Sequence, residues 1–259
     1  MQIITLTTDF GIGDYDTGVL HGVILGIAPD ARLVDLTHAI PAHDIRTAAI
    51  LLGRAAPYFP PGTIHMAVVD PGVGTSRRAI AARLGEQYFV GPDNGLLTLM
   101  LNQAELPPEI VQLNRPDFWL AEVSPIFHGR DIFSPVAAHL ARRVKLAELG
   151  RPIHDPVLLD IPRPQPIHQG WRGEVVQIDA FGNLATNLEK QHARAGSQTV
   201  RVGGAEIHGL VLTFGDGKPG DLVALFDSSD RLSVCEVNGS AAHRLNARTG
   251  DPVELIYYP

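Results

Sequence analysis

The stretch TIHMAVVDPGVGTSRR, residues 63–78, begins as an apolar run and ends in charged side chains. Apolar runs of about four to eight residues bounded by turn residues are typical of strands buried in a parallel sheet. This run stops at Asp70, and the proline and glycines that follow predict a turn. A turn does not require the acid, nor does it require Arg77 and Arg78. We therefore expect these charged residues to belong to a functional site.

The segments before this stretch alternate between strand-like and helix-like patterns. Residues 3–10 and 32–38 are strand-like, whereas residues 17–28 and 42–58 have helical patterns. Strands separated by helices of this length predict right-handed parallel crossovers in a doubly wound sheet. We therefore expect an α/β N-terminal domain with a mostly parallel central sheet, completed downstream by a hairpin and two more helices.

A proline-rich stretch follows the α/β pattern. Residues 151–170 contain five prolines, which exclude a continuous helix and disfavour a central strand. Short alternating runs separated by glycine and Asp/Asn turns come next, and they predict a smaller all-β, barrel-like C-terminal domain. The expected organisation is an α/β domain over residues 1–152, a linker over residues 153–170 and a β-barrel-like domain over residues 171–259.

The composition limits the classes of partner. The chain has 259 residues, is 45% hydrophobic and carries a net charge of −7. Because basic clusters are missing from the sequence, we expect neither a nucleic acid nor an anionic membrane as partner, and a small ligand fits better. Cys235 is the single cysteine, which excludes a disulfide within the chain. Without a signal-peptide pattern or an apolar run of roughly 18 residues, the expected location is the cytoplasm.

Polar side chains follow two of the predicted strands and precede one helix. Asp9 ends the first strand and Asp70 ends the third, and open α/β sheets bind ligands at the edge where parallel strands end. His128 stands directly before a predicted helix, whose first N–H groups favour an anion or a polarised water. Asp70, Arg77 and His128 are therefore a candidate acid/base cluster. The alternative for His128 is a capping or packing role.

The second predicted domain contains a glycine turn with polar and aromatic neighbours. The segment IDAFGNLATNL places Asp179, Phe181 and Asn183 around this turn, where an aromatic face and an amide could bind a purine. A plain strand, turn and strand would give the same pattern. The histidines of the chain form no HxxxH or HExxH pattern, so we expect no dedicated zinc site.

Several motifs together resemble the adenosine-forming S-adenosylmethionine (SAM) hydrolases, also called SAM hydroxide adenosyltransferases, which are relatives of fluorinating and chlorinating enzymes. The resemblance spans nearly the whole chain. It implies hydrolysis of SAM to adenosine and L-methionine by attack of an activated water or hydroxide at the ribose 5′ carbon. It also implies a homotrimer with active sites between subunits, and we expect neither a cofactor nor a metal. The motifs are, in order, TTDFG, DPGVGTSRR, GPDNGLL, FHGRDIF and DAFGNLATN.

The resemblance also implies roles for individual residues. Asp70, Arg77 and His128 match the hydrolytic set of the family, whereas the halogenating relatives carry other residues there. The matching substrate contacts are Asp9 for the ribose, Asp14 and Asp179 for the methionine ammonium, Ser228 for its carboxylate, Asn183 for the adenine edge and Phe214 beside the adenine. The chain departs from the fluorinating relatives at one place. It has Ser228-Ser229 and Glu236 where they have a Ser-Arg pair and a later arginine.

Two other interpretations stay open on the sequence. The segment TTDFGIGDYD, residues 7–16, is also similar to the N-terminal aspartate cluster of calcium-dependent nucleoside hydrolases, in which carboxylate oxygens hold a hard cation. A nucleoside-binding module without turnover is the third hypothesis.

Overall fold

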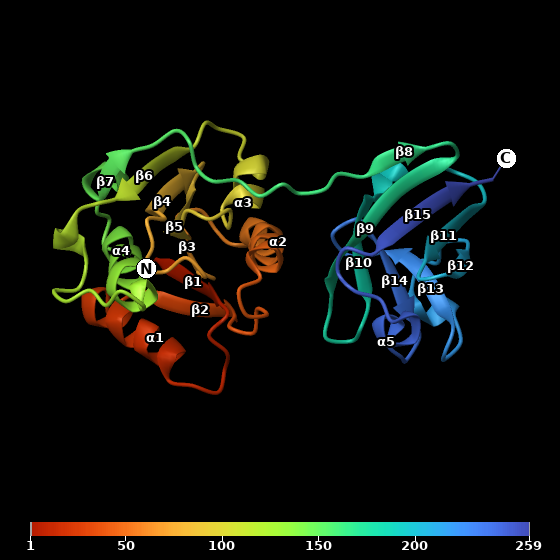
Figure 1. Cartoon of the computed structure of the whole chain (residues 1–259), viewed down its shortest axis with the longest axis horizontal. Helices are drawn as coiled ribbons and strands as arrows, with labels where there is room; N and C mark the ends of the chain where they lie inside the picture. The colour runs from red at the N-terminus through yellow and green to blue at the C-terminus, as the bar shows by residue number, and fades with distance from the viewer. Residues whose placement is uncertain (1, 259) are drawn as a thin grey trace. The chain divides into compact units, whose positions relative to one another are not determined.

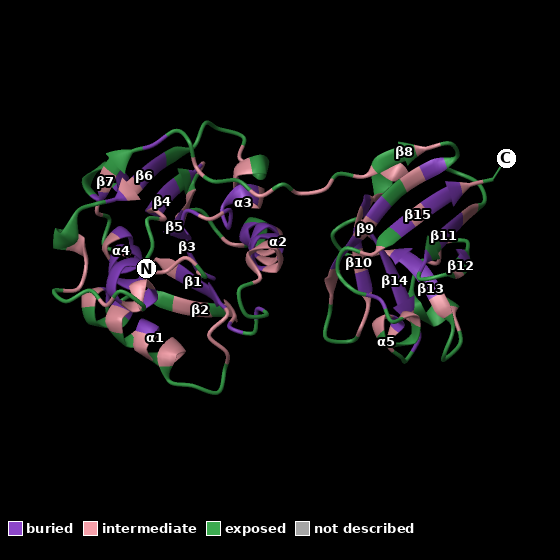
Figure 2. Cartoon of the chain, viewed as in Figure 1, coloured by how far each residue is buried: buried purple, intermediate pink, exposed green. Residues whose placement is uncertain are grey.

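The structure is a computed structural model that describes residues 2–258. It divides into two compact units, Met1–Leu159 and Asp160–Pro259, called the first and second unit below. Each unit has its own sheet and its own buried core (Figures 1 and 2). No helix among residues 2–258 has the length and hydrophobicity that a membrane crossing requires.

The first unit is built on a seven-stranded sheet in the order β2-β1-β3-β5-β4-β6-β7 (Figure 1). β2, β1, β3 and β5 are parallel to one another. β4 pairs antiparallel with β5, β6 antiparallel with β4, and β7 antiparallel with β6. The sequence-based prediction of an α/β domain is confirmed, although β6 and β7 were not predicted. The strands are β1 (Ile3–Thr8), β2 (Arg32–Thr37), β3 (Ile64–Val68), β4 (Ala79–Leu84), β5 (Gln87–Pro92), β6 (Glu109–Leu113) and β7 (Gly150–Pro152).

Helices cover both faces of this sheet. α1 (Asp16–Ile27) and α4 (Ser134–Ala141) share one core cluster with the sheet, whereas α2 (Ile45–Ala55) and α3 (Thr98–Gln103) share the other. The chain crosses from β1 to β2 through α1 and then passes β1 to reach β3 through α2. The strand order therefore reverses between β1 and β3, which is where open α/β sheets form their ligand crevice.

Local sequence explains where the predicted helices begin and end. The helix expected over residues 42–58 begins at Ile45 because the Asp44 carboxylate accepts a hydrogen bond of 2.9 Å from the Thr47 N–H and caps it. It tightens into a short 3₁₀ helix that contains Pro57. The short helical turns of the chain are η1 (Ala56–Tyr58), η2 (Pro116–Phe118), the π-helical η3 (Gly129–Phe133), η4 (Leu146–Glu148), η5 (Lys190–His192) and η6 (Phe214–Asp216).

The second unit is an antiparallel, nearly closed sheet in the order β12-β11-β15-β9-β10-β14-β13, with β8 paired to β9. The first half of β9 pairs with β15 and its second half pairs with β10, so this one strand continues through two parts of the sheet. The predicted barrel-like all-β fold is confirmed. Its elements are β8 (Gln165–Ile167), β9 (Gly170–Ile178), β10 (Leu184–Glu189), β11 (Gln198–Val202), β12 (Ala205–His208), β13 (Leu222–Phe226), β14 (Arg231–Glu236), α5 (Ala241–Leu245) and β15 (Pro252–Tyr257).

The middle of the proline-rich segment is held by hydrogen bonds on either side of the boundary between the two units. The Leu159 N–H donates to Thr98 Oγ1 at 2.9 Å in the first unit, and the Pro162 carbonyl accepts from Asn187 Nδ2 at 2.9 Å in the second. β8 lies inside this segment and pairs only with β9, as an edge position tolerates proline. The boundary between the two units therefore falls between residues 159 and 160, within the stretch expected to be a linker.

Candidate active site

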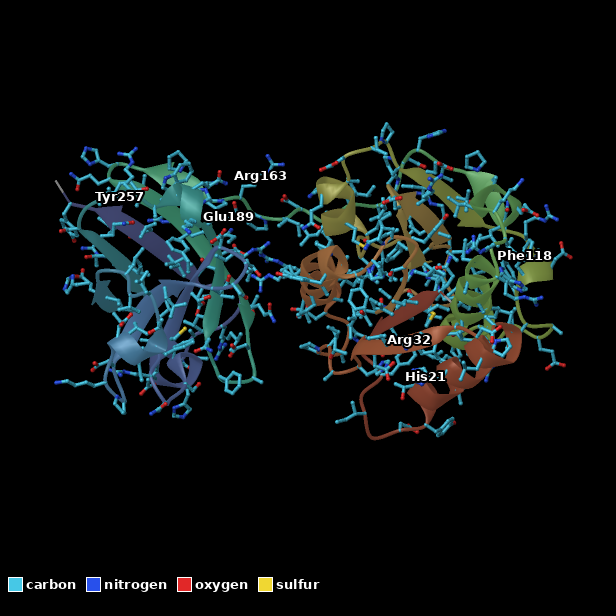
Figure 3. The ribbon with its side chains drawn as sticks, turned by 180° about the vertical axis from the view of Figure 1, so that it is seen from behind. His21, Arg32, Phe118, Arg163, Glu189 and Tyr257 are labelled. Atoms are coloured by element: carbon cyan, nitrogen blue, oxygen red, sulfur yellow. The ribbon has the colours of Figure 1, made fainter. Side chains whose placement is uncertain are left out.

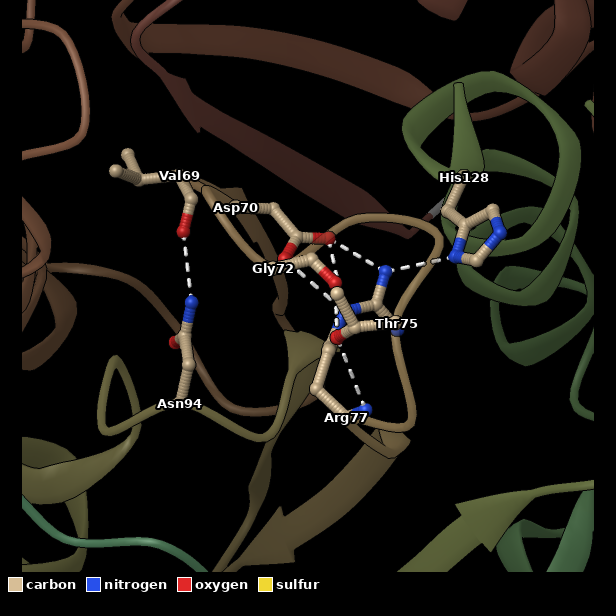
Figure 4. A network of polar contacts seen from close by, with 7 residues as sticks. All are labelled: Val69, Asp70, Gly72, Thr75, Arg77, Asn94 and His128. Atoms are coloured by element: carbon tan, nitrogen blue, oxygen red, sulfur yellow. Dashed lines mark hydrogen bonds and ion pairs between the residues drawn. The ribbon is translucent and has the colours of Figure 1, made fainter. Parts of the chain in front are cut away.

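Asp70, Arg77 and His128 form one hydrogen-bonded network in the first unit (Figure 4). Arg77 Nε donates to both carboxylate oxygens of Asp70, at 3.0 and 2.9 Å, and Arg77 Nη2 donates to His128 Nδ1 at 2.7 Å. The Asp70 side chain is only 4% exposed and that of Arg77 only 10%. The structure thus brings together the three residues of the predicted acid/base cluster.

A tight turn after β3 places Asp70 beside Arg77. The Val73 N–H donates to the Asp70 carbonyl at 3.1 Å, and Thr75 Oγ1 donates to the Gly72 carbonyl at 2.6 Å. Gly74 has a φ of +76°, and a Cβ there would lie 2.5 Å from the Pro125 carbonyl oxygen. Glycine is required at this position because a side chain would fit neither the backbone conformation nor the space.

Hydrogen bonding fixes the protonation state of His128. A guanidinium only donates hydrogen bonds, so Nδ1 of His128 is the acceptor and the proton of the neutral ring is on Nε2. Burial lowers the pKa of His128, and the charge of Arg77 lowers it further, against smaller opposite effects of Asp70 and Asp131. The imidazole is therefore neutral at neutral pH and offers an N–H from Nε2.

Further side chains hold the elements that carry this network. Asp131 is fully buried and accepts from the Ser124 N–H at 2.8 Å and from Arg130 Nε at 2.6 Å, which fixes the loop before η3. Asn94 Nδ2 donates to the Val69 carbonyl at 2.8 Å and thereby holds the end of β3 (Figure 4). Sequence reasoning assigned no role to Asn94, although it lies in the GPDNGLL motif.

A cavity of about 180 Å³ lies beside the network, at the ends of β1 and β3. Asp9, Asp70 and His128 line it together with Phe10 and Phe127. The two phenyl rings meet edge to face with their centroids 5.9 Å apart. Neither ring was predicted from the sequence, although Phe10 is next to Asp9 in TTDFG and Phe127 is next to His128 in FHGRDIF.

The two predicted substrate contacts of the first unit differ in their surroundings. Asp9 faces the cavity, and its Oδ2 accepts from the His43 N–H at 2.8 Å. Asp14 lies in the exposed loop before α1, where its Oδ1 accepts from the Tyr15 N–H at 2.6 Å, and it does not line the cavity.

In the second unit, Asp179 and Asn183 close one turn. Asp179 Oδ1 accepts from the N–H groups of Phe181 and Asn183 at 2.9 Å each, and its Oδ2 accepts from Asn183 Nδ2 at 2.8 Å. Gly182 has a φ of +82° and lies against Ser240, which leaves no room for a side chain. The turn leaves the Phe181 ring 77% exposed.

The remaining predicted contacts lie on other loops of the second unit. Phe214 begins η6 and is half-exposed, and Ser228 lies in the exposed turn between β13 and β14. Among residues 2–258, no described hydrogen bond joins Ser228 to the turn of Asp179. Arg244 Nη1 lies 3.6 Å from Glu236 Oε1, so α5 supplies a cation next to this glutamate. No motif in the sequence indicated Arg244.

Comparisons with known proteins agree on one family. The profile of the SAM hydroxide adenosyltransferase N-terminal domain matches residues 4–150, and that of the C-terminal domain matches residues 173–254. A curated relative from Thermus thermophilus, named (R)-S-adenosyl-L-methionine hydrolase, is 41% identical over 99% of this chain and 100% of its own. One from Salinispora arenicola with the same name is 39% identical over 97% of each chain.

More distant relatives and a solved structure complete these comparisons. A protein of Actinoplanes sp. named fluorinase is 27% identical over 96% of this chain and 95% of its own. The crystal structure of an uncharacterized conserved protein from Thermotoga maritima superposes with a TM-score of 0.92 at 34% identity, covering 99% of this chain and 100% of that one.

Proposed function

The chain belongs to the SAM hydroxide adenosyltransferase family, and we infer from this membership that it hydrolyses S-adenosyl-L-methionine to adenosine and L-methionine. The observation that carries the inference is the Asp70–Arg77–His128 network, which is complete and faces a cavity at the ligand-binding edge of the sheet. Relatives named hydrolases match at 39–41% identity and the relative named fluorinase at 27%, which favours water over a halide as the nucleophile.

The reaction is a displacement at the ribose 5′ carbon. The water oxygen forms a bond to this carbon while the bond from carbon to the sulfonium sulfur breaks and its electron pair goes to the sulfur. Methionine therefore leaves as a neutral thioether and needs no acid. The water loses one proton, so a site that favours hydroxide and holds it in line with the sulfur accelerates the reaction.

The three residues of the network have different roles in this proposal. Arg77 places a positive charge beside the cavity and thereby favours hydroxide over water. His128 donates from Nε2 to the same oxygen, since its Nδ1 is occupied by Arg77. Both oxygens of Asp70 are engaged by Arg77, so Asp70 positions the guanidinium and the proton of the water leaves to solvent.

The substrate contacts come from the family resemblance and from the position of Asp9 in the cavity. A carboxylate at Asp9 suits a ribose diol, and carboxylates suit the methionine ammonium. The proposed contacts are Asp9 with the ribose, Asp14 and Asp179 with the ammonium, Ser228 with the methionine carboxylate, and Asn183 and Phe214 with the adenine.

We also propose a homotrimer with active sites between subunits. The cavity in the first unit has about 180 Å³, which is less than the roughly 300–1,000 Å³ of typical small-molecule sites. The proposed contacts are divided between Asp9 and Asp14 in the first unit and four residues in the second. Cyclic head-to-tail association would give every subunit the same two half-sites. A cytoplasmic location and the lack of a nucleic-acid partner stay predictions from the sequence.

Product analysis tests the proposed reaction. Incubation with SAM should yield adenosine and L-methionine in equal amounts, and high chloride or fluoride should give no halogenated nucleoside. Release of free adenine would instead support a nucleoside hydrolase. Binding of SAM or adenosine without any product would support a nucleoside-binding module.

Complementation tests the shared site. Asp70→Ala inactivates the first-unit half, and a variant with Asn183 and Phe214 both replaced by alanine binds SAM so weakly through its second-unit half that it is nearly inactive at SAM concentrations near the wild-type KM, which are used in the test. When the two variants are unfolded together and refolded as random trimers, about one quarter of the sites combine two intact halves, so activity should return toward that fraction of wild type. Sites within single chains would stay inactive at every mixing ratio.

A further inference from the structure

Two histidines and one aspartate meet on the first unit, outside the cavity described above. His21 lies on α1, where Figure 3 labels it, Asp35 lies on β2, and His38 follows the end of β2. Asp35 Oδ1 lies 2.7 Å from His21 Nε2 and 3.1 Å from His38 Nε2. One carboxylate oxygen therefore lies between two imidazole nitrogens that come from different elements.

The His38 ring is buried, and only one of its two nitrogens has a hydrogen-bond partner. Its side chain is 6% exposed, and its Nδ1 lies 2.8 Å from Thr8 Oγ1. Its Nε2 is buried, makes no well-directed hydrogen bond and points toward Asp35. A histidine with one nitrogen held by a hydrogen bond and the other directed at a carboxylate has the arrangement of a metal ligand with its supporting contact.

We propose that His21, Asp35 and His38 bind a divalent transition-metal ion of the zinc type. Two imidazole nitrogens and one carboxylate oxygen form a ligand set that such ions prefer. The ligand atoms lie within 4.8 Å of one another. Ligand atoms around a tetrahedral zinc lie roughly 3.3 Å apart, so the two distances from Asp35 Oδ1 to the histidine nitrogens, 2.7 and 3.1 Å, need to lengthen by roughly 0.6 and 0.2 Å to admit the ion.

The surroundings of the site leave a coordination position open to solvent. The side chains of Asp35 and His21 are 43% and 29% exposed, so an ion can enter from this side and water can complete its coordination. Mg²⁺ and Ca²⁺ prefer oxygen ligands, and a site with two imidazoles therefore discriminates against them. The ligand set thus predicts selectivity for Zn²⁺, Co²⁺ or Ni²⁺.

The ion would connect α1 to the ends of β1 and β2. Thr8, which contacts His38, directly precedes Asp9, and the His38 carbonyl accepts from the Gly11 N–H at 2.8 Å. The site therefore adjoins the loop that carries Asp9 and Asp14. None of the three proposed ligands lines the cavity beside Asp70, which makes this a structural site.

This proposal revises the expectation from sequence that the chain has no zinc site. A search for two histidines on one helix misses the cluster, because its ligands come from a helix, a strand and the residue after that strand. The local signal is the segment DLTH, residues 35–38, which places an aspartate and a histidine three positions apart.

Calorimetric titration of the untagged full-length chain, freed of metal by dialysis against a chelator, tests the proposal. Zn²⁺ should bind with a stoichiometry of one ion per chain and raise the Tm, Co²⁺ should give a visible absorption spectrum, and Mg²⁺ and Ca²⁺ should do neither. His21→Gln and His38→Ala should weaken Zn²⁺ binding more than about 100-fold, and Thr8→Val about 10- to 100-fold.

His168→Gln is the matched control, since His168 is an exposed histidine of the second unit, and it should bind Zn²⁺ like wild type. His21 lies on the surface of α1, so His21→Gln should fold even where His38→Ala does not, which circular dichroism checks. Wild type without stoichiometric Zn²⁺ binding, or a folded His21→Gln variant that binds as tightly as wild type, would overturn the proposal.

Discussion

The polar groups proposed for function are held in opposite ways in the two units. In the first unit, the side chains of Asp70 and Arg77 are nearly inaccessible and bonded to each other, and Arg77 is also bonded to His128 on a distant element. In the second unit, Asp179 and Asn183 lie in a surface turn and bond to each other within it. Groups that must favour a charge on water need fixed partners in a water-poor site, whereas groups that bind a substrate can stay near the surface.

The two arrangements also differ in what a substitution costs. Removing one partner of a buried ion pair leaves an uncompensated charge and destabilises a protein by about 3–5 kcal/mol. Removing one hydrogen bond of an exposed turn costs about 0.5–1.5 kcal/mol. Substitutions in the first unit should therefore affect both rate and stability, and those in the second unit mainly substrate binding.

The largest effect is expected from Arg77→Met. This change removes the positive charge beside the cavity and leaves the Asp70 carboxylate buried without its partner. We expect kcat to fall about 10²- to 10⁴-fold and the Tm to fall as well. Steady-state kinetics and thermal unfolding measure both.

Arg83→Gln is the control for this substitution. Arg83 is 47% exposed and pairs with the exposed Glu109, so kcat and Tm should stay close to those of wild type. If Arg77→Met raised KM and left kcat unchanged, the first unit would contribute to substrate binding and not to the rate, as proposed for the second unit.

His128→Asn should have the next largest effect. Asparagine can still accept a hydrogen bond from Arg77 but cannot present the N–H of an imidazole, so we expect kcat to fall about 100-fold with a small change in KM. Full turnover in this variant would exclude His128 from the chemistry.

Asn183→Ala tests the second unit. Its amide is proposed to read the adenine edge, so the variant should raise KM about 10- to 100-fold and leave kcat within a few-fold of wild type. Asn187→Ala is the comparison within the same unit, since the Asn187 amide bonds to the Pro162 carbonyl. A lower kcat at unchanged KM in Asn183→Ala would place it with the chemistry instead.

The pH dependence of kcat/KM should show a smaller effect that comes from His128 in the first unit. Burial and Arg77 lower the pKa of His128, so the neutral ring should persist below pH 6.5 and the acid limb of kcat/KM should lie below this value. An unperturbed histidine would retain about one tenth of the activity at pH 5.5. The result against this expectation is an acid limb of kcat/KM at or above pH 6.5 in wild type that disappears in His128→Asn. The limb would then belong to His128, and its pKa would not be lowered by burial and Arg77.

The stability of the fold should also decrease at acidic pH, because of a buried histidine. Burial lowers the pKa of His65 to about 4, whereas the unfolded chain has the ordinary value. The unfolded state therefore binds more protons between these values, and the free energy of unfolding should fall as the pH is lowered from about 6.5 to about 4.

The smallest effect is expected from Phe214→Ala. Phe214 is 50% exposed, so it contributes through contact with the adenine rather than through the core. An aromatic contact is worth about 0.5–1.5 kcal/mol, and KM should rise about 2- to 10-fold with an unchanged Tm. A large fall in Tm would show instead that Phe214 is a core residue.

Features of the fold that depend on the local sequence pattern were predicted correctly. The alternation of strands and helices predicted the sheet of the first unit, and carboxylates at the ends of β1 and β3 predicted where Asp9 and Asp70 lie. These predictions succeed because period and turn residues are encoded within each segment. β6 and β7 were missed, since these antiparallel strands depend on pairing partners elsewhere in the chain.

Contacts between distant elements could not be read in the same way. The bond from Arg77 to His128 joins residues 51 positions apart, and the sequence made them a candidate cluster without showing that their side chains meet. Arg244 beside Glu236, and the cluster of His21, Asp35 and His38, arise only when helices pack on strands. Neither carries a motif with a fixed spacing.

The most direct measurement is turnover of SAM in water labelled with oxygen-18, followed by mass spectrometry of the nucleoside. If water held beside Asp70, Arg77 and His128 attacks the ribose 5′ carbon, adenosine should carry one labelled oxygen at its 5′ hydroxyl, and Arg77→Met should abolish most of this product. Free adenine, or adenosine without label at the 5′ hydroxyl, would contradict the account.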